Sequence, residues 1–337
     1  MRVETRRPPV PQAGASANRA GANSGAEWRG GTTPQPKKAA RIYLTDAQRQ
    51  IDFPTGENTL SISRAAGIWT MTASDINLAR YSDPEVVKHY VGVEGLQRSE
   101  AYLFDKYIPS GAAVLDIGVG GGRTTPFLSA KASAYVGVDF SQGMVDACAA
   151  KFPALEFHRA DACDLGRFED ASFDVVVFSF NGIDYIQSDE ARARCMREVN
   201  RVLRLDGRFI FSSHNARSLL VWPMLRGATP VQQVWRALLA IGRSAGLAAR
   251  RWPTRAFREG KGYLVDPTEH GVVTFVSTPE VIAVEAGFAG FRVDEIVNGL
   301  YPENPPAIFT PWYYYSLAKA GRPTLPPNVK PPIGWQP

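Results

Sequence analysis

Two acidic residues and a glycine-rich turn form the part of the sequence best suited to chemistry. Residues 114–125 read VLDIGVGGGRTT, in which Asp116 ends an apolar run and Gly118 and Gly120 follow it. A second apolar run, YVGVD, ends in Asp139. Glycines between a strand and a helix let a ligand approach the backbone because no side chain stands in the way. The pattern therefore predicts a ligand site with a carboxylate at each end.

The glycine spacing argues against two common nucleotide sites. A dinucleotide-binding turn reads G-x-G-x-x-G/A, but Arg123 stands where its third small residue belongs. A phosphate-binding loop ends in G-K-[ST], and this turn does not. An acid after the second strand is where nucleotide-binding α/β sheets take ribose hydroxyls. An acid at the end of the first strand suits a free α-amino group, which has three donors and a positive charge. A ligand that carries both groups is S-adenosylmethionine.

The order of motifs resembles that of the class I S-adenosylmethionine-dependent methyltransferases over about residues 111–320. VLDIGVGGGRTT is similar to that family's first motif, VGVDFS to its second, RADACDL to its third, FDVVVFSFNGIDYI to its fourth, and REVNRVLRLDGRFIF to the segment that leads into strand five. Two positions depart from the family pattern. Val119 stands where Cys or another small residue is usual, and Asp206 with Gly207 replaces a pair of glycines.

The resemblance implies a set of cofactor-binding residues. Asp116, Gly118 and Gly120 are expected to hold the methionine part of the cofactor, and Asp139 the ribose. The other residues implied are Phe140 and Met144 against the ribose and adenine, Asp161 and Ala162 on the adenine edge, and Ser179 and Asn181 near the sulfonium.

Methyl transfer from a sulfonium requires the nucleophile, methyl group and sulfur to be aligned. A hydroxyl acceptor also needs a base or a metal that removes its proton. His214, with Asn215 beside it, follows FIFSS at the carboxyl end of a predicted strand, where open α/β sheets place ligands. His214 is the first candidate base, and a structural polar strand end is the alternative. His270 is the second candidate, Tyr185 is expected to face the acceptor or pack over the cofactor, and no metal set is visible.

The elements that position these residues read as an α/β fold with a doubly wound, mostly parallel, seven-stranded sheet. Apolar runs such as DVVVFSF are typical of parallel strands covered on both faces. Strands are predicted at 114–117, 135–138, 156–159, 175–179, 208–213, 291–297 and 312–318, with short extended pieces near 59–62 and 68–72. Helices are predicted from 84, over 98–107, 123–130, 142–151 and 188–203, and from 279 to 287.

The composition divides the chain into four segments, the third of which contains an insertion. Residues 1–40 are rich in Ala, Gly, Pro and Ser and are expected to be a disordered basic tail. Residues 41–110 are expected to supply helices that cover the site, and residues 111–320 the methyltransferase core. Within this core, residues 216–265 interrupt the strand and helix rhythm and are interpreted as an inserted substrate lid. Residues 321–337 form a proline-rich tail.

The net charge of +5 comes from residues 1–40, which hold seven Lys and Arg against two Glu; the remaining 297 residues balance 31 basic against 31 acidic side chains. A neutral body argues against specific nucleic-acid binding. The NPPA sequence at 304–307 lacks the final aromatic residue that base-flipping methyltransferases use. Three cysteines without paired spacing, and no apolar run near the ~18 residues of a membrane span, predict a cytoplasmic protein.

The segment 216–262 is strongly basic, with nine Lys and Arg against one Glu. Its apolar stripe at helical spacing consists of Val231, Val234, Trp235, Leu238 and Ile241. One interpretation is an amphipathic helix packed on the core. The other is a lid that meets an anionic, nucleotide-linked or lipid-linked acceptor, or a membrane surface.

These observations predict a methyltransferase that uses S-adenosylmethionine and acts on a small-molecule or glycan acceptor, on oxygen. Methylation of nitrogen or carbon in secondary metabolism is the alternative within the enzyme class. A protein that binds the cofactor without catalysis, or a basic membrane adaptor, is the alternative outside it.

Overall fold

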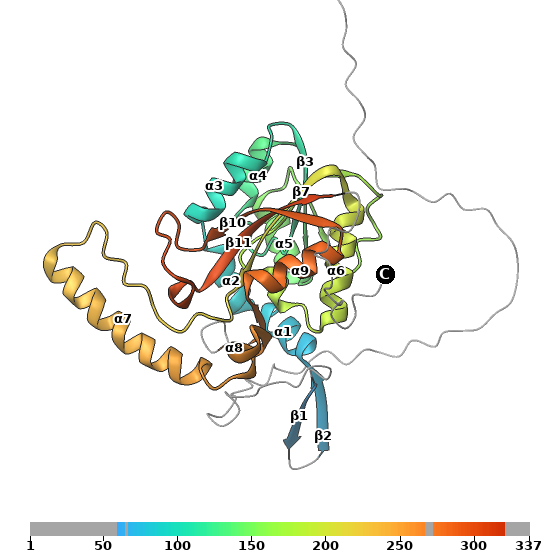
Figure 1. Ribbon diagram of the computed structural model, residues 1–337. Coiled ribbons are helices and arrows are strands. Elements are labelled where there is room, and N and C mark those ends of the chain that lie inside the picture. The colour runs from blue at the N-terminus through green and yellow to red at the C-terminus, as the bar shows by residue number, and fades with distance from the viewer. Residues whose placement is uncertain (1–58, 65–66, 267–271, 321–337) are drawn as a thin grey trace, which may run out of the picture.

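The computed structural model describes residues 59–64, 67–266 and 272–320. Its centre is a seven-stranded sheet in the order β10-β11-β7-β6-β3-β4-β5 (Figure 1). The strands are β3 (Ala112–Ile117), β4 (Ala132–Asp139), β5 (Glu156–Arg159), β6 (Phe173–Phe178), β7 (Leu203–His214), β10 (Phe291–Asn298) and β11 (Trp312–Lys319). Strand β11 is antiparallel to β7 and β10, while the pairs from β7 to β5 are parallel. The predicted fold class is therefore confirmed.

Helices cover both faces of this sheet, which explains the continuous apolar strands. Side chains of β6 alternate between two cores: Val175 and Val177 belong to one, Val176 and Phe178 to the other. The first core also takes side chains from α3 (Arg98–Tyr107) and α4 (Thr125–Lys131); the second takes them from α6 (Asp189–Val202) and α9 (Pro279–Phe288). Burial of each such side chain contributes about 1.5–3 kcal/mol. Helix α5 (Gln142–Lys151) follows β4.

The N-terminal part supplies a hairpin and two short helices. The hairpin consists of β1 (Thr59–Arg64) and β2 (Gly67–Thr72), and the helices are α1 (Ala73–Tyr81) and α2 (Pro84–Val91). Thr72 and Asp75 form a reciprocal capping box at the start of α1, and Asp83 caps α2 ahead of Pro84. The helix beginning at residue 84 was predicted, whereas α1 was missed because its sequence, ASDINLARY, has little apolar periodicity.

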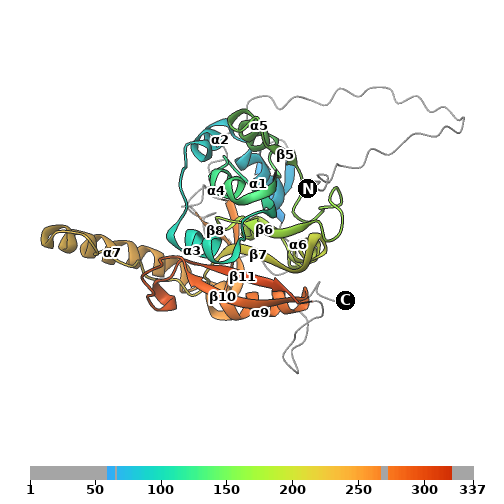
Figure 2. The same ribbon diagram turned by 90° about the horizontal axis from the view of Figure 1, so that it is seen from above.

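The segment after β7 departs most from a simple alternation of strands and helices. It contains α7 (Pro230–Arg251), α8 (Arg255–Glu259) and an antiparallel hairpin of β8 (Lys261–Asp266) and β9 (Val272–Ser277). Figures 1 and 2 both show α7 projecting away from the body of the domain. Short 3-10 helices, η2 (Gly182–Tyr185) and η3 (Ala307–Phe309), complete the described elements.

The departure from the family's paired glycines has a local structural outcome. Asp206 adopts a φ of 61°, in the left-handed region that glycine enters most easily and Asp tolerates better than most residues. Gly207 has no room for a side chain, because a Cβ there would lie 2.8 Å from the carbonyl oxygen of Arg204. The second glycine of the pattern is therefore the one that packing requires.

Candidate active site

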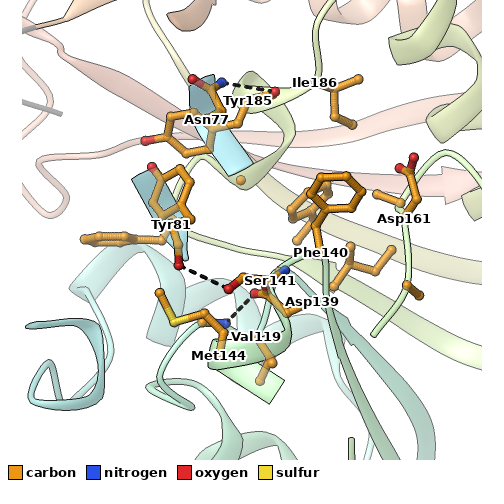
Figure 3. A pocket seen from close by; sticks show the side chains of 18 of the residues that line it. Asn77, Tyr81, Val119, Asp139, Phe140, Ser141, Met144, Asp161, Tyr185 and Ile186 are labelled. Carbon is orange, nitrogen blue, oxygen red and sulfur yellow. Dashed lines mark hydrogen bonds between the residues drawn. The ribbon is translucent and has the colours of Figure 1, made fainter. Parts of the chain in front are cut away.

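A cavity of about 370 Å³ lies at the carboxyl ends of β3, β4 and β6 (Figure 3). Turns after these strands and after β5 form one side of it, and residues of α1, α2 and η2 form the other. The predicted cofactor-binding residues that line it are Asp116, Gly118, Gly120, Asp139, Phe140, Met144, Asp161, Ala162 and Ser179. Asn181 is not among the lining residues. The topology thus brings together side chains from four separate motifs.

Asp116 lies beneath the glycine turn and is almost fully buried. Its Oδ2 atom accepts hydrogen bonds from the Thr124 hydroxyl at 2.7 Å and from the Tyr135 hydroxyl at 2.9 Å. Burial raises the pKa of the Asp116 carboxyl to about 7, although both hydroxyl donors oppose the shift. A cationic ligand group at this carboxyl would lower that pKa again.

The turn itself is shaped by glycines. Gly118 and Gly120 have φ angles of 63° and 55°, which favour glycine. At Gly121 a Cβ would collide with the backbone of Tyr90, because the end of α2 packs directly on the turn. The glycine turn therefore has two roles: it admits a ligand on one side and the N-terminal cover on the other.

Asp139 holds the opposite end of the cavity. Its Oδ2 accepts the backbone N–H of Gly120 at 2.9 Å and its Oδ1 that of Ser141 at 2.8 Å. Burial raises the pKa of this carboxyl, and the backbone donors act against that rise. Beyond it, Met144 is buried while Phe140 and Asp161 are exposed at the rim. This order of groups suits a ligand with a polar ribose between an ammonium and an aromatic base.

Aromatic side chains form the wall opposite the glycine turn. The Tyr81 ring, at the end of α1, meets Tyr185 edge-on with centroids 5.1 Å apart and lies 5.8 Å from Tyr90 (Figure 3). Asn77 anchors α1, since its side-chain amide exchanges two 2.9 Å hydrogen bonds with the backbone of Val273. Of these residues, Tyr185 was predicted from the sequence, whereas Tyr81 and Asn77 were not. No motif marks these two, because their place depends on how α1 docks.

Ser179 is tied to a buried ion pair beside the turn. Its hydroxyl donates to Glu100 of α3, and Arg123 grips the same carboxylate with two hydrogen bonds of 2.6 and 2.7 Å. The Arg123 guanidinium also lies 4.8 Å from the Phe180 ring centre. Arg123, the residue that broke the dinucleotide pattern, therefore joins α3 to the first turn of the sheet. Glu100 was not predicted from the sequence, because its partner is 23 residues away.

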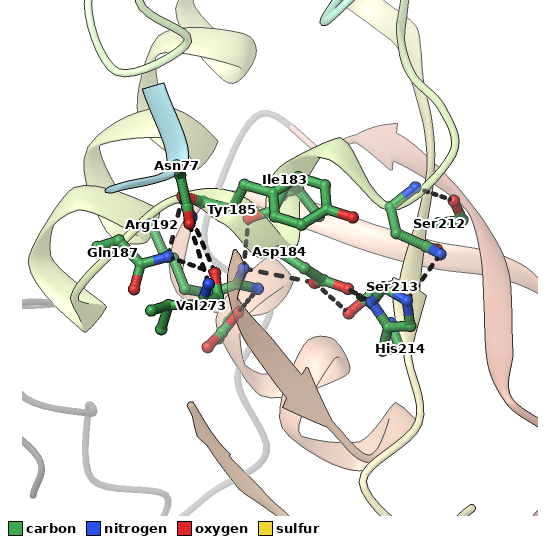
Figure 4. Close-up of polar contacts among 12 residues, drawn as sticks. Asn77, Ile183, Asp184, Tyr185, Gln187, Arg192, Ser212, Ser213, His214 and Val273 are labelled. Carbon is green, nitrogen blue, oxygen red and sulfur yellow. Dashed lines mark hydrogen bonds and ion pairs between the residues drawn. The ribbon is translucent and has the colours of Figure 1, made fainter. Parts of the chain in front are cut away.

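The predicted base lies behind the cavity wall. His214 Nδ1 donates to Asp184 Oδ2 at 2.8 Å, the His214 backbone N–H bonds the same oxygen at 2.7 Å, and Ser213 bonds the other carboxylate oxygen (Figure 4). His214 Nε2 lies 3.2 Å from the amide of Asn181, which has a left-handed φ of 62°. Neither His214 nor Asn215 lines the cavity. The arrangement orients the imidazole and places Asn181 against its second nitrogen.

Other predicted residues have different surroundings. The Asn215 side chain donates to the carbonyls of Ala307 and Thr310, both at 2.8 Å, so it fastens a loop. His270 lies outside the described residues. No residue of the segment 216–262, all of which is described, lines the cavity. Residues of α1 and α2 line the cavity, and the segment 216–262, interpreted from sequence as a lid, supplies none of its lining.

Part of the sequence is similar to proteins of a known family. Residues 115–211 match a family model described as a methyltransferase domain. A demethylmenaquinone methyltransferase of Clavibacter sepedonicus is 33% identical over 104 residues, which cover 30% of this chain and 40% of that protein. A ubiquinone/menaquinone biosynthesis C-methyltransferase of Geotalea uraniireducens (strain Rf4) is 30% identical over 123 residues, covering 34% and 51%. The chain therefore spans about half, or less, of the curated relatives it matches.

The family match runs from β3 to β7 and includes the glycine turn and the Asp139 strand end. The chain carries a class I S-adenosylmethionine-dependent methyltransferase domain. Solved structures similar to it include the CcbJ methyltransferase of Streptomyces caelestis, at 18% identity and a TM-score of 0.48 over 72% of this chain and 98% of that one. An S-adenosylmethionine-dependent methyltransferase of Mesorhizobium loti has 19% identity and a TM-score of 0.48 over 65% and 97%.

For the methyltransferase domain, the predicted family and its cofactor, S-adenosylmethionine, are confirmed. The residue roles stay predictions. Within the described part of the chain, none of the helices combines the length and the apolar character needed to cross a bilayer. Nor do the described residues contain a group of three or more His, Cys, Asp or Glu side chains suited to a metal ion.

Proposed function

We propose that the protein transfers a methyl group from S-adenosylmethionine to a small, planar acceptor with an aromatic or quinoid ring. The observation that carries this proposal is the composition of one cavity. Asp116, the glycine turn and Asp139 line one side of it, and Tyr81 and Tyr185 line the other. Flat, apolar walls with hydroxyl groups at their edges suit a ring with polar substituents.

The residues present fit the cofactor. Asp116 would accept from its ammonium group, since the Thr124 and Tyr135 hydroxyls both donate to the same carboxylate oxygen, Oδ2. Asp139 would accept from the ribose hydroxyls, and Met144 and Phe140 would pack against the adenine, since all three line the cavity. When bound, the cofactor supplies an activated methyl group on a sulfonium. The protein then needs chiefly to align the acceptor and keep water out.

The roof over the cavity suits that positioning task. Asn77 fixes α1 to β9 through Val273, and Gly121 fixes α2 to the cofactor turn. Tyr81 and Tyr185 are held edge to face between these anchors. An acceptor ring that packs between the tyrosines and the glycine turn is shielded from solvent and has few orientations open to it.

We propose oxygen as the acceptor atom and His214 as the base. Asp184 keeps the proton on His214 Nδ1, so Nε2 is the nitrogen that can accept one. Asn181 covers Nε2, so its side chain would have to turn away before an acceptor could reach that nitrogen. A phenolic hydroxyl is the simplest acceptor that such a base would serve.

Carbon is the second candidate atom. The two quinone-biosynthesis relatives support it: one is a demethylmenaquinone methyltransferase and the other a C-methyltransferase. Loss of the same phenolic proton raises electron density at the adjacent ring carbon, so both candidates share the base and the flat acceptor. A glycan acceptor, which sequence analysis left open, fits the aromatic walls less well because its hydroxyls would lose their water.

The test uses the full chain with S-adenosylmethionine and two acceptor panels, one of naphthols and naphthoquinols, the other of sugar nucleotides. Release of S-adenosylhomocysteine and a 14-dalton mass gain are expected for the first panel only. Nuclear magnetic resonance of the product separates oxygen from carbon methylation. Turnover confined to the sugar nucleotides would contradict the planar acceptor. Tight S-adenosylhomocysteine binding without turnover on any acceptor would instead favour a non-catalytic, cofactor-binding protein.

A further inference from the structure

The segment after β7 forms an arm that extends from the domain. Residues 216–229 run outward, held near their start by the Leu219 backbone N–H, which donates to the carbonyl of Ile308 at 2.9 Å. Helix α7 returns alongside, and the Val221 backbone N–H donates to the Ser244 hydroxyl at 2.9 Å. Figures 1 and 2, at right angles to each other, show that α7 extends well beyond the sheet and its covering helices.

One side of α7 faces residues 216–229, which form a strap along the helix, and the opposite side faces solvent. Ala240 is buried and Ser244 half-buried on the strap side. At about 100° per residue, positions 234, 238 and 241 lie roughly 100–160° around the helix from Ala240. The apolar side chains on this exposed face are Val231, Val234, Trp235, Leu238 and Ile241, each 56–68% exposed. A helix that buries almost none of its apolar stripe on its own domain is suited to another surface.

Basic side chains lie on the flank of α7 between residues 216–229 and the exposed apolar face. At about 100° per residue, positions 236, 243 and 250 fall roughly 40–80° around the helix from Ala240, on the side away from Ile241. Arg236 also donates to the carbonyl of Met224 at 2.6 Å. Arg236, Arg243 and Arg250 are exposed and recur every seven residues, so each lies within about 20° of the last. Over the segment 216–262 the charges sum to +8, from nine basic residues and Glu259. Trp235 and Trp252, both 63% exposed, add aromatic rings of the kind enriched where apolar and aqueous phases meet.

We propose that α7 is an interfacial helix that docks this domain on a bilayer containing anionic lipids. The apolar face would enter the boundary between headgroups and acyl chains, and the arginine flank would meet the negative headgroups. The charge of the arm favours this occupant over two others. A second copy would bring one +8 segment against another, and residues 1–40 of the same chain carry +5 themselves.

This surface is separate from the cavity, because no residue of 216–262 lines it. Docking therefore does not rest on methyl transfer, and the two proposals can fail independently. An acceptor with an apolar tail would partition into the same bilayer, which would raise its concentration near the domain.

The experiment measures co-sedimentation of the full chain with vesicles of phosphatidylcholine, with and without phosphatidylglycerol. Binding is expected to the anionic vesicles, and it should fall as salt is raised because surface charges are screened. At about 1 kcal/mol for each Arg near the surface, or roughly fivefold, the triple variant Arg236→Gln/Arg243→Gln/Arg250→Gln should lower the partition coefficient on the order of 100-fold. The matched control is Arg98→Gln/Arg167→Gln/Arg197→Gln, three exposed arginines elsewhere that should leave binding nearly unchanged.

A second pair of variants tests the apolar face. Leu238→Gln/Ile241→Gln keeps good or neutral helix propensity and should weaken vesicle binding by about tenfold or more. Leu205→Gln/Phe127→Gln removes two exposed apolar side chains outside the arm and should not. Circular dichroism and S-adenosylhomocysteine binding should be unchanged in both pairs.

Three results would overturn the proposal. The first is no vesicle binding at any lipid composition. The second is equal binding to neutral and anionic vesicles, unaffected by the arginine variants. The third is a dimer in sedimentation velocity that Leu238→Gln/Ile241→Gln dissociates while vesicle binding is absent, because a second copy would then cover the face.

Discussion

The cofactor pocket and the α7 arm differ in whether their side chains find partners within the domain. In the pocket and just beside it, the carboxylates of Asp116, Asp139 and Glu100 all have hydrogen-bond donors within the domain. In the arm, side chains such as Val231 and Ile241 remain about two-thirds exposed. A buried polar group must be partnered for the fold to persist, whereas an exposed apolar stripe is completed by something outside it. The pocket is thus organised by the fold itself, and the arm by a partner.

The largest expected effect concerns Asp139. Asp139→Ala should lower the affinity for S-adenosylhomocysteine at least 100-fold, as measured by calorimetry. The variant removes the proposed ribose acceptor and also the group that anchors the Gly120 N–H. Asp139→Asn keeps one oxygen for the turn and separates the two causes: it should retain the fold and still bind weakly. Unchanged affinity in both variants would refute the ribose assignment.

His214 is expected to affect turnover and spare binding. His214→Ala should lower kcat about 100-fold or more if the imidazole is the base, with little change in cofactor affinity. His214→Gln, which can keep a hydrogen bond to Asp184, is the folded control and should lose activity equally. Near-normal turnover in either variant would mean that the acceptor proton leaves by another path.

Alanine substitutions at one glycine in each region should have opposite effects. At Gly121 a Cβ meets the Tyr90 backbone, so Gly121→Ala should displace α2, cost about 1–3 kcal/mol of stability and weaken cofactor binding. At Gly242 in α7 nothing lies within 4 Å, so Gly242→Ala should leave binding unchanged and stabilise the helix by up to about 1 kcal/mol. Thermal melts with calorimetry measure both. Equal tolerance at the two sites would show that α2 does not pack on the turn.

The smallest effect is a pH dependence of binding through Asp116. Its carboxyl has a pKa of about 7 without ligand, raised by burial, and an ammonium group would lower it on binding. Below pH 7 the ligand must therefore displace a proton, so the affinity for S-adenosylhomocysteine should fall as pH falls, by at most about tenfold per unit. Asp116→Asn, whose oxygen can still accept from Thr124 and Tyr135, should remove this slope. A slope that persists in Asp116→Asn would assign the proton to another group.

Much of the sheet could be predicted because the pattern of each strand lies within a short stretch of sequence. Continuous apolar runs, each ended by a turn or an acid, placed the strands from β3 to β7, and the boundaries of β5 and α5 were predicted to the residue. The glycine turn and the two aspartates could be recognised for the same reason, since each lies beside its own strand end. The departure at Asp206 was visible too, although its left-handed backbone was not.

Contacts between distant segments could not be predicted in this way. Glu100 and Arg123 pair across 23 residues, and Asn77 and Val273 across 196. Nothing in ASDINLARY indicates that Tyr81 will face a cofactor turn, because α1 takes its place from Val273 and not from its own periodicity. His214 was predicted at a strand end, but its contact with Asn181 and its absence from the cavity lining depend on a loop from another part of the chain.

The sequence by itself determined the order of the seven sheet strands and of the helices from α2 to α6, the two acids that end β3 and β4, and the basic, apolar-striped character of residues 230–251. These features depend on residue spacing within one element, because the period of a helix or strand sets which residues share a face. Tertiary structure decided which helices roof the cavity, which nitrogen of His214 is covered, and that α7 stands away from the site instead of over it. Those outcomes depend on how separate elements pack, and packing is settled by shape and by partners far apart in the chain.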